Sequence, residues 1–416
     1  MKLGEALQRT LANAVRAPYY RQAFGETWKR VRRVEDLPRL PLLDKLTAIA
    51  QQRRLVVGRA PTGFGVASSG TTRGDLDLPL LNVFRVEDFE TGGFSDPAAE
   101  PSPGWVLVCV AVNHGLPGPA GPDELQVPWA HDRNSLSMME SLLARRQPDG
   151  RRVTGLRISA GALKVFTTWL RERGKAPRDF GVEVIGTNSF RVTPSWKRVI
   201  EDAFGARVVD NYSLSELPTF ATECTRCGWH HWNLPAMIAE VLHLASGRQV
   251  HRGVGRLVCT TLVPSVQKMP LIRYDTGDVV EVGPRCRATG EPSLRFLGRA
   301  RRGLITRTGD FLLAPTHVQD VLEASSQTER SEHPCFKLGI IKSREVGLPR
   351  WTVALEKRVA QLRFEVRFDP LIHAAEARRL EAQVHRALSK KSAKKFELRV
   401  TAVRAQSLTP LPDKHD

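Results

Sequence analysis

Residues 68–74 read Ser-Ser-Gly-Thr-Thr-Arg-Gly, and this short run is the most informative stretch of the chain. Its glycines allow the backbone angles of a tight loop, and its hydroxyl groups donate hydrogen bonds to phosphate oxygens. The run lacks the lysine of the pattern G-x-x-x-x-G-K-[ST], so it is not a lysine-bearing phosphate loop. A flexible turn has the same composition. The run therefore indicates a triphosphate loop only when other motifs accompany it.

Four further segments accompany it in a fixed order. Residues 211–216 read Asn-Tyr-Ser-Leu-Ser-Glu, residues 273–278 read Arg-Tyr-Asp-Thr-Gly-Asp, and residues 298–299 read Gly-Arg. Gly309 and Pro315 complete the set. Together the five segments resemble the motifs of adenylate-forming enzymes, the superfamily of acyl-CoA synthetases, luciferases and peptide-synthetase adenylation domains. Five ordered motifs are a specific signal, whereas each alone is weak.

The branch that the chain most resembles is that of phenylacetate-CoA ligase and coenzyme F390 synthetase. The similarity lies in residues 17–21 (Ala-Pro-Tyr-Tyr-Arg), in Leu40 and Pro41 with Lys45, and in residues 269–274. The resemblance implies an α/β fold with two parts. A large adenylate-forming N-terminal domain of several subdomains is expected over residues 1–300, and a small, mobile α+β lid domain over residues 301–416.

Hydrophobic periodicity independently predicts α/β layering, because helical and strand-like segments alternate through the middle of the chain. Helices are expected at residues 4–17, 44–52, 136–146, 160–173, 193–204 and 374–388. Strands are expected at residues 105–112, 182–185, 206–209, 255–262, 271–274, 279–282, 337–342, 351–355 and 396–403. Residues 113–128, rich in Gly and Pro, are expected to form a loop.

The resemblance implies an ATP-dependent, AMP-forming acid ligase. Such an enzyme joins a carboxylic acid to AMP, releases pyrophosphate, and passes the acyl group to a thiol of CoA or of a carrier protein. Thr71, Glu216 and Lys414 would be the catalytic residues, with Glu216 holding Mg²⁺, which prefers hard carboxylate oxygens. The residues implied in ATP binding are Ser68, Ser69, Gly70, Thr71, Thr72, Gly186, Asp210, Asn211, Tyr212, Ser215, Asp278 and Arg299.

Each implied role has a plainer alternative. Asp278 would accept hydrogen bonds from the ribose, but aspartate after Thr-Gly is also a common turn residue. Tyr212 would lie along the adenine, but it could equally be a core aromatic residue. Lys414 would contact the α-phosphate, yet the usual preceding glycine is missing and a terminal lysine is often a frayed charge.

Departures from the family limit what can be carried over. Arg73 replaces a common glycine, and Arg301 stands where the hinge is often Asp. Residues 113–128 replace the aromatic- and glycine-rich segment that helps to build the acyl pocket in the phenylacetate branch, and residues 186–189 replace an expected Gly-Gly-Glu-like segment. The acid substrate therefore cannot be inferred from the resemblance.

A separate cluster of thiols and imidazoles suggests a metal site. Cys224 and Cys227 form a CxxC pair, followed by His230 and, further along, by Cys286. Three thiolates and one imidazole make a closed tetrahedral shell of the kind that holds structural Zn²⁺. His230 is preferred to His231 because a Gly-x-His follows the Glu-Cys position in the phenylacetate branch. The alternative is an ordinary turn with reduced thiols.

Composition narrows the classes of protein to which the chain could belong. The formal net charge of +18 and the pI near 10.1 keep polyanions in view, but arginines are spread along the chain, so a dedicated nucleic-acid site is disfavoured. Six cysteines without a signal-like N-terminus, and no apolar run long enough for a membrane span, favour a cytoplasmic protein. A homodimer is left open.

Two alternatives to the thiol ligase stay open. The nearest is an amide or ester synthetase, with an amine or hydroxyl acceptor, or a nucleotidyl-transferring enzyme similar to F390 synthetase. The other is a non-catalytic, basic binding module on a degenerate ligase fold, since fold does not fix function. Retention of the motif residues together argues for an enzyme.

Overall fold

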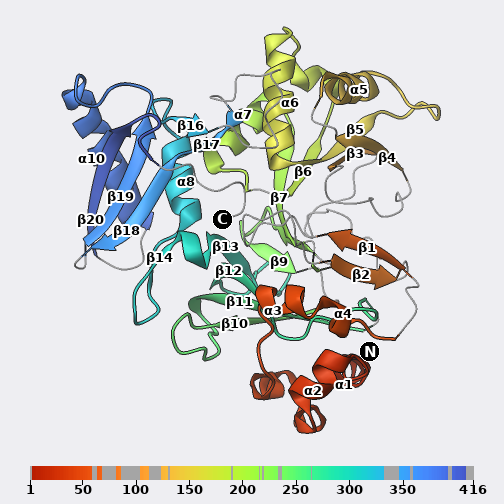
Figure 1. The fold of residues 1–416 in the computed structure, drawn as a ribbon. Coiled ribbons are helices and arrows are strands. Elements are labelled where there is room, and N and C mark those ends of the chain that lie inside the picture. Colours follow the sequence, from red (N-terminus) through yellow and green to blue (C-terminus); the bar gives the residue numbers. More distant parts are fainter. Residues whose placement is uncertain are drawn as a thin grey trace. The chain divides into compact units, whose positions relative to one another are not determined.

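The computed structural model describes residues 2–58, 63–67, 81–85, 104–111, 123–129, 132–188, 191–214, 216–217, 220–232, 237–263, 265–331, 346–356, 359–391 and 396–408. These residues belong to two compact units (Figure 1). The β unit comprises segments within 1–99, 111–121 and 211–295, and the α/β unit comprises segments within 100–110, 122–210 and 296–416. Neither unit is one continuous stretch. The domain boundary near residue 300 therefore stays a prediction.

Parallel strands form the centre of the α/β unit (Figure 1). The order β7-β6-β5-β3-β4 joins β7 (Arg207–Ser213), β6 (Val184–Asn188), β5 (Val153–Ser159), β3 (Trp105–Ala111) and β4 (Glu124–Trp129). The pairs β7–β6, β6–β5 and β5–β3 are parallel. Parallel pairing needs crossover connections, here supplied by α5 (Arg133–Ala144), α6 (Ala160–Glu172), η5 (Pro177–Phe180) and α7 (Pro194–Phe204).

One apolar core fixes these helices on the sheet. Leu163 and Phe166 of α6 are fully buried in the same core as Leu156 of β5 and Ile185 of β6. Hydroxyl caps start two of the helices: the Ser159 side chain accepts from the N–H of residue 162, and the Thr193 side chain from that of residue 196. The carboxyl ends of β6 and β7, where ligands bind in open α/β sheets, are thereby held in place.

The C-terminal part of the α/β unit has a second core. Its elements are η6 (Ala300–Arg302), β14 (Leu304–Ile305), β15 (Phe311–Leu313), α8 (Pro315–Glu323), β16 (Arg330–Ser331), β17 (Leu348–Pro349), β18 (Trp351–Glu356), β19 (Val359–Val366), α10 (Ala374–Lys391) and β20 (Glu397–Arg404). β18 and β19 pair antiparallel, β19 and β20 pair parallel, and α10 makes the crossover. Leu380, Val384 and Leu388 recur at helical spacing on its buried face and pack with Leu362 and Phe364.

The β unit is mainly antiparallel. Its elements are α1 (Leu3–Ala14), α2 (Pro18–Phe24), η1 (Thr27–Arg30), η2 (Val34–Arg39), α3 (Lys45–Ala50), α4 (Gln52–Leu55), β1 (Gly63–Ala67), β2 (Leu81–Arg85), β8 (Phe220–Glu223), β9 (His230–Trp232), β10 (Met237–Leu242), β11 (Gly253–Thr261) and β12 (Tyr274–Val282). The pairs β1–β2, β10–β11, β11–β12 and β8–β9 are antiparallel, and the end of β7 pairs with β8. Unit boundaries fall inside β3, β7 and β13 (Leu294–Arg299).

The α/β class expected from the sequence is confirmed, with local corrections. Residues 124–128, expected in a loop, belong to β4, and residues 271–273, expected in a strand, precede β12 as a turn. Arg273 in that turn has a positive φ of 51°, which a β-strand does not allow. The helix expected at residues 4–17 ends at Ala14, and Pro18 begins α2, where its missing N–H costs nothing. The strand expected at 337–342 lies outside the described residues.

Candidate active site

Glu216 lies in a buried cluster of polar side chains within the β unit. Its side chain is 5% exposed, and its Oε1 atom lies 2.9 Å from Nζ of Lys45, which is 10% exposed. The hydroxyl of Tyr274 donates to the same oxygen over 3.2 Å. The carboxylate that the sequence assigns to Mg²⁺ is therefore buried, oriented and paired with a cation.

A short bridge explains why Lys45 meets Glu216. Leu43 pairs with Tyr274: its N–H donates to the carbonyl of Arg273 over 3.0 Å, and its carbonyl accepts from the N–H of Asp275 over 2.9 Å. Lys45 follows two residues later as the first residue of α3. The bridge thus fixes the start of α3 against the start of β12.

Asp278 is oriented by the tyrosine of the neighbouring motif. The Tyr212 hydroxyl donates to Oδ2 of Asp278 over 2.6 Å, and Asp278 is 7% exposed. Thr276 accepts from the N–H of Asp278 over 3.1 Å and donates to the carbonyl of Leu257 over 2.9 Å. Both motifs therefore contribute to one hydrogen-bonded group, and the Asp278 carboxylate has a fixed direction.

The ring of Tyr212 also packs in an aromatic contact. Its centroid lies 6.1 Å from that of Trp232 in an edge-to-face arrangement. Asn211, the preceding residue, is buried and accepts from the Thr222 hydroxyl over 2.8 Å. Tyr212 thus has the core contacts of the plainer alternative together with its hydrogen bond to Asp278.

Three further expected residues lie in the α/β unit. Gly186 on β6 pairs in register with Val209, and the Thr187 hydroxyl donates to Oδ1 of Asp210 over 3.2 Å. Arg299 ends β13. Gly186 and Asp210 therefore lie at the carboxyl end of adjacent parallel strands, where the fold class places ligands.

Gly298, before Arg299, makes a close approach that only glycine allows. Its φ is 102°, and a Cβ at this position would lie 3.0 Å from Cβ of Pro315, the first residue of α8. The Thr316 hydroxyl donates to the carbonyl of Leu297 over 3.2 Å. The Gly-Arg motif therefore fastens β13 to the start of α8 and sets the direction in which Arg299 leaves the strand.

Several expected residues lie outside the described part of the chain. They are Ser68, Ser69, Gly70, Thr71, Thr72, Ser215 and Lys414. Their assignments stay predictions. Conversely, sequence reasoning gave Lys45 no role at Glu216, because a contact between residues so far apart in the chain leaves no local pattern.

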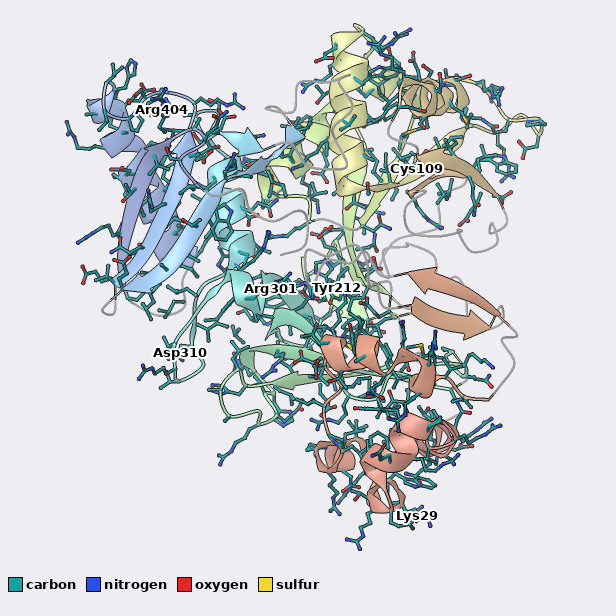
Figure 2. All side chains as sticks on the ribbon, in the orientation of Figure 1. Lys29, Cys109, Tyr212, Arg301, Asp310 and Arg404 are labelled. Atoms are coloured by element: carbon teal, nitrogen blue, oxygen red, sulfur yellow. The ribbon has the colours of Figure 1, made fainter. Side chains whose placement is uncertain are left out.

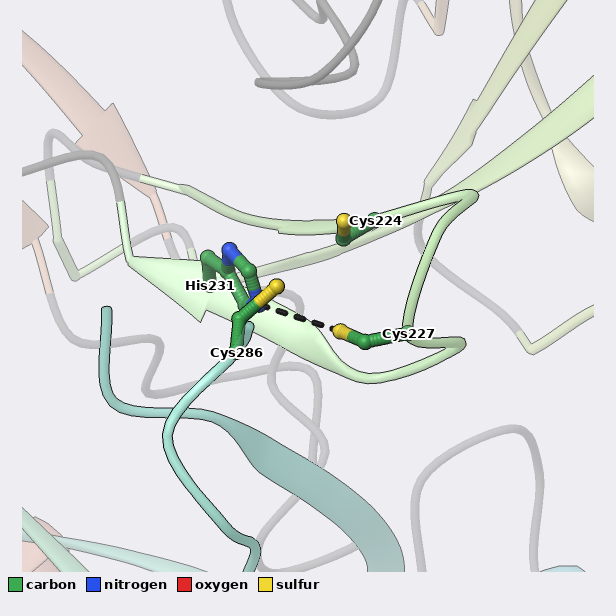
Figure 3. A group of neighbouring side chains, drawn as sticks. All are labelled: Cys224, Cys227, His231 and Cys286. Atoms are coloured by element: carbon green, nitrogen blue, oxygen red, sulfur yellow. Dashed lines mark hydrogen bonds between the residues drawn. The ribbon is translucent and has the colours of Figure 1, made fainter. Parts of the chain in front are cut away.

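A second cluster, remote in sequence from the phosphate loop, joins three cysteines and one histidine of the β unit (Figure 3). One ligand atom from each of Cys224, Cys227, His231 and Cys286 lies within 4.8 Å of every other. Sγ of Cys227 lies 3.2 Å from Nε2 of His231. Although burial acts to raise it, hydrogen bonds from Thr289 and its neighbouring backbone lower the pKa of Cys286 to about 7. Burial raises the pKa of Cys227 to about 12.

Two similar turns present the cysteines. The N–H of Gly228 donates to the carbonyl of Cys224, and the N–H of Gly290 donates to the carbonyl of Cys286, each over 2.7 Å. The N–H of Cys224 and that of Cys286 each donate to the carbonyl five residues later, over 2.9 Å. The glycines, Gly228 and Gly290, have φ values of 68° and 73°. Cys224 and Cys286 therefore occupy equivalent positions in two copies of one turn.

The copies differ at their fourth residue, which is Cys227 in the first turn and Thr289 in the second. His231 supplies the missing fourth ligand atom. Its other ring nitrogen, Nδ1, lies 3.3 Å from the Thr289 hydroxyl and 3.5 Å from Oε2 of Glu291. Metal-bound histidines are commonly oriented in this way by a hydroxyl or carboxylate on the second nitrogen.

The preference for His230 is corrected in favour of His231. Both residues lie on β9, and successive side chains of a strand point to opposite faces. His231 is 1% exposed and faces the thiols, whereas His230 is not part of the group. The register of β9 decided the choice, and the sequence did not reveal that register.

The positive charge is not confined to one segment. In Figure 2 nitrogen-tipped side chains project from both units, with Lys29 labelled in one and Arg404 in the other. Among the described helices, none has both the length and the apolar character required to cross a bilayer. The cysteines described at positions 109, 224, 227, 259 and 286 are free.

The fold is that of AMP-forming acyl-CoA ligases. An open conformation of 2-hydroxyisobutyryl-CoA ligase, in complex with 2-HIB-AMP and CoA, matches with a TM-score of 0.71 and 18% identity, over 98% of this chain and 89% of that chain. No family model matches the sequence, and no curated protein matches it. The fold is therefore established through structure.

Two other ligases show the same likeness over part of their length. Benzoate CoA ligase from Burkholderia xenovorans LB400 matches with a TM-score of 0.53 and 14% identity, over 81% of this chain and 65% of that chain. ATP-bound MatB from Rhodopseudomonas palustris matches with a TM-score of 0.52 and 14% identity, over 85% of this chain and 66% of that chain.

Proposed function

We propose that this protein is an ATP-dependent, AMP-forming ligase that activates a carboxylic acid and transfers its acyl group to a thiol. The observation that carries the proposal is the buried group in which Glu216 and Asp278 are each oriented by a tyrosine of a neighbouring motif. Buried, hydrogen-bonded carboxylates are costly to maintain. Two of them at motif positions, on a ligase fold, favour a retained site over a degenerate scaffold.

In the first half-reaction the acid's carboxylate oxygen attacks the α-phosphorus of ATP. A phosphorus–oxygen bond forms to the acid, the bond to the β-phosphate bridge breaks, and pyrophosphate leaves. Catalysis of this step depends on position and on charge stabilisation. Asp278, held by Tyr212, would accept hydrogen bonds from the ribose. Arg299 is assigned to the ribose and phosphates on its sequence motif.

Glu216 fits Mg²⁺ by its donor chemistry. It offers a hard carboxylate oxygen with a fixed direction, and its present partner, Lys45, is itself a cation. When bound, Mg²⁺ neutralises the developing charge on the phosphate oxygens. The 68–72 loop is assigned to the phosphates and Lys414 to the α-phosphate oxygen on the sequence motifs alone.

In the second half-reaction a nucleophile attacks the acyl carbon and AMP leaves. We assign the acceptor as the thiol of CoA, because a structural neighbour holds an acyl-AMP together with CoA. A carrier-protein thiol undergoes the same chemistry. Free cysteines in the described part of the chain are consistent with a reducing cytoplasm.

The decisive experiment is ATP–pyrophosphate exchange with Mg²⁺ over a panel of aryl, fatty, hydroxy and amino acids. We expect one acid class to stimulate exchange. Adding CoA, an amine or a hydroxyl acceptor to that acid then identifies the second substrate. A folded protein that neither binds ATP nor exchanges pyrophosphate with any acid would contradict the proposal and favour the non-catalytic module.

We further propose that Cys224, Cys227, His231 and Cys286 hold one structural Zn²⁺. Three thiols and an imidazole close a tetrahedral shell, and two copies of one cysteine turn face each other across the group. The ion would link the β8–β9 hairpin to the loop after β12. A closed shell leaves no position for substrate, so its role is stability.

Metal analysis of the purified chain should give about one zinc per protein. His231→Ala should lose zinc, while His230→Ala, its neighbour on the opposite face of β9, should retain it. Cys286→Ser should also lose zinc and lower the thermal midpoint. A metal-free parent that folds normally, or zinc lost equally from both histidine variants, would overturn the assignment.

A further inference from the structure

Lys45 is the residue at the site whose role the proposed function leaves open. Its ammonium lies 2.9 Å from the Glu216 oxygen, and both side chains are at most one-tenth exposed. Removing two charges from water carries a free-energy penalty that only good pairing geometry offsets. The cation at this position therefore calls for an explanation.

The placement of Lys45 is built into the fold. Leu43 is hydrogen-bonded on both sides to the start of β12, and the guanidinium of Arg273 donates to the carbonyl of Leu40 over 2.6 Å. Asp44 caps α3 by accepting from the N–H of Thr47 over 2.9 Å. The segment that carries Lys45 is thus fastened before and after the lysine, so its ammonium is aimed at Glu216.

Glu240, a second buried acid of the same unit, forms a more rigid ion pair than Glu216 does. Glu240 accepts from the guanidinium of Arg273 through both oxygens, over 3.1 and 3.0 Å. Such a two-point contact is geometrically rigid. Lysine instead presents a point charge on a flexible four-carbon stem, which can leave an oxygen without moving the backbone.

We propose that Lys45 is a positioning residue that acts as the internal counter-ion of Glu216 and competes with Mg²⁺ for its carboxylate. The inference rests on the proposed function, because it needs Glu216 to be the metal-binding acid. Without metal the ammonium pairs with the carboxylate and orients it. When Mg²⁺·ATP binds, the ammonium gives up the shared oxygen.

The test is a Mg²⁺ titration of thermal stability at fixed, saturating ATP with no acid substrate present. Lys45→Met leaves Glu216 buried without its cation, so we expect a lower midpoint in the absence of Mg²⁺ and a larger rise on adding MgCl₂. The half-saturating Mg²⁺ concentration should fall about tenfold or more, because the Lys45 charge disfavours a second cation on the same carboxylate, just as a neighbouring cation lowers a carboxyl's proton affinity about tenfold or more. Lys45→Arg, which can make the rigid two-point contact, should raise that concentration above the parental value.

Two controls separate the possible failures. Lys45→Gln, which keeps a hydrogen bond but no charge, replaces Lys45→Met if that variant does not fold. Glu216→Gln should remove the difference between the Lys45 variants and the parent. If Glu216→Gln leaves the Mg²⁺ response of the parent unchanged, the metal assignment in the proposed function is wrong. If Glu216→Gln abolishes the response but Lys45→Met titrates at the parental concentration or above, only the inference about Lys45 is wrong.

Discussion

Two buried lysine–glutamate pairs lie in different units of the chain. Lys45 and Glu216 of the β unit are 2.9 Å apart and 10% and 5% exposed, while Lys164 and Glu323 of the α/β unit are 3.1 Å apart and 4% and 0% exposed. In distance and burial they are nearly the same. Their surroundings differ, and the difference separates a pair at a chemical site from a pair that holds two helices together.

Glu323 is surrounded by donors from its own unit. Its Oε1 accepts from Lys164 on α6 and from Gln319 on α8, each over 3.1 Å. Its Oε2 accepts from the Thr193 hydroxyl at the start of α7 over 2.6 Å. Glu216 also has partners from its own unit, but one of them, Tyr274, lies on β12, the motif strand that carries Asp278. Distance and burial alone do not reveal a role; the neighbouring groups do.

The largest expected effect is on the stability of the α/β unit. Lys164→Met leaves the Glu323 carboxylate buried without its cation, so the free energy of unfolding should fall by about 3–5 kcal/mol. Urea denaturation followed by circular dichroism measures the change. MgCl₂ and ATP should not restore it, whereas we expect them to restore Lys45→Met.

A double variant sharpens this prediction. Replacing both partners, as Lys164→Met with Glu323→Leu, removes both charges and should recover much of the lost stability, because an apolar pair of similar volume avoids the desolvation cost. If the single variant unfolds within about 1 kcal/mol of the parent, the Lys164–Glu323 pair is not the structural contact we describe.

The second-largest expected effect is on the rate of ATP–pyrophosphate exchange. Glu216→Gln keeps the size and one hydrogen-bonding oxygen of the side chain but removes the charge that Mg²⁺ requires. Loss of a single stabilising group for transition-state charge costs about 10²–10³-fold in rate, so exchange should fall by that amount. Initial rates of ATP–pyrophosphate exchange, at a protein concentration corrected for folded fraction, measure it. Exchange within a few fold of the parent would remove Glu216 from the metal role.

Periodic segments of the fold could be predicted from the sequence. α6, α7, α10 and β3 lie where hydrophobic spacing places them, because each buries one regular face. β5 and β19 were missed. Both contain charged residues, and Glu365 of β19 is fully buried beside Arg350, so the strand lacks a plain apolar run. A partner far along the chain compensates that charge, and local patterns do not show it.

The candidate site likewise contains residues that the sequence indicated and contacts that it did not. The resemblance to the family's motifs pointed to Glu216, Asp278 and Tyr212, whose roles stay predictions. It gave neither the Lys45–Glu216 contact nor the choice of His231, since the first depends on a bridge between distant segments and the second on strand register. Pairings made by tertiary packing have no signature in a single sequence.

The smallest expected effect is a difference in pH dependence between the two units. Burial raises the pKa of Asp320 on α8 above its ordinary 3.8, although the charges of Arg191 and Lys391 oppose the shift. Burial also acts to raise the pKa of Asp44, but hydrogen bonds from Thr47 outweigh it and the pKa is lowered. The folded chain therefore binds the Asp320 proton more tightly than the unfolded chain, and the Asp44 proton less tightly.

The signs follow from proton linkage. Stability linked to Asp320 falls as the pH rises through the window just above 3.8, and Asp320→Asn should remove that fall. Stability linked to Asp44 is present above pH 3.8 and is lost as the pH drops through the lower folded pKa. Asp44→Asn can still cap α3 and should therefore reduce the loss of stability at acid pH. Urea midpoints measured across the acid range should show opposite changes in slope, below pH 3.8 for Asp44→Asn and above pH 3.8 for Asp320→Asn. Equal slopes in both variants would mean that the two carboxyls do not differ as their surroundings imply.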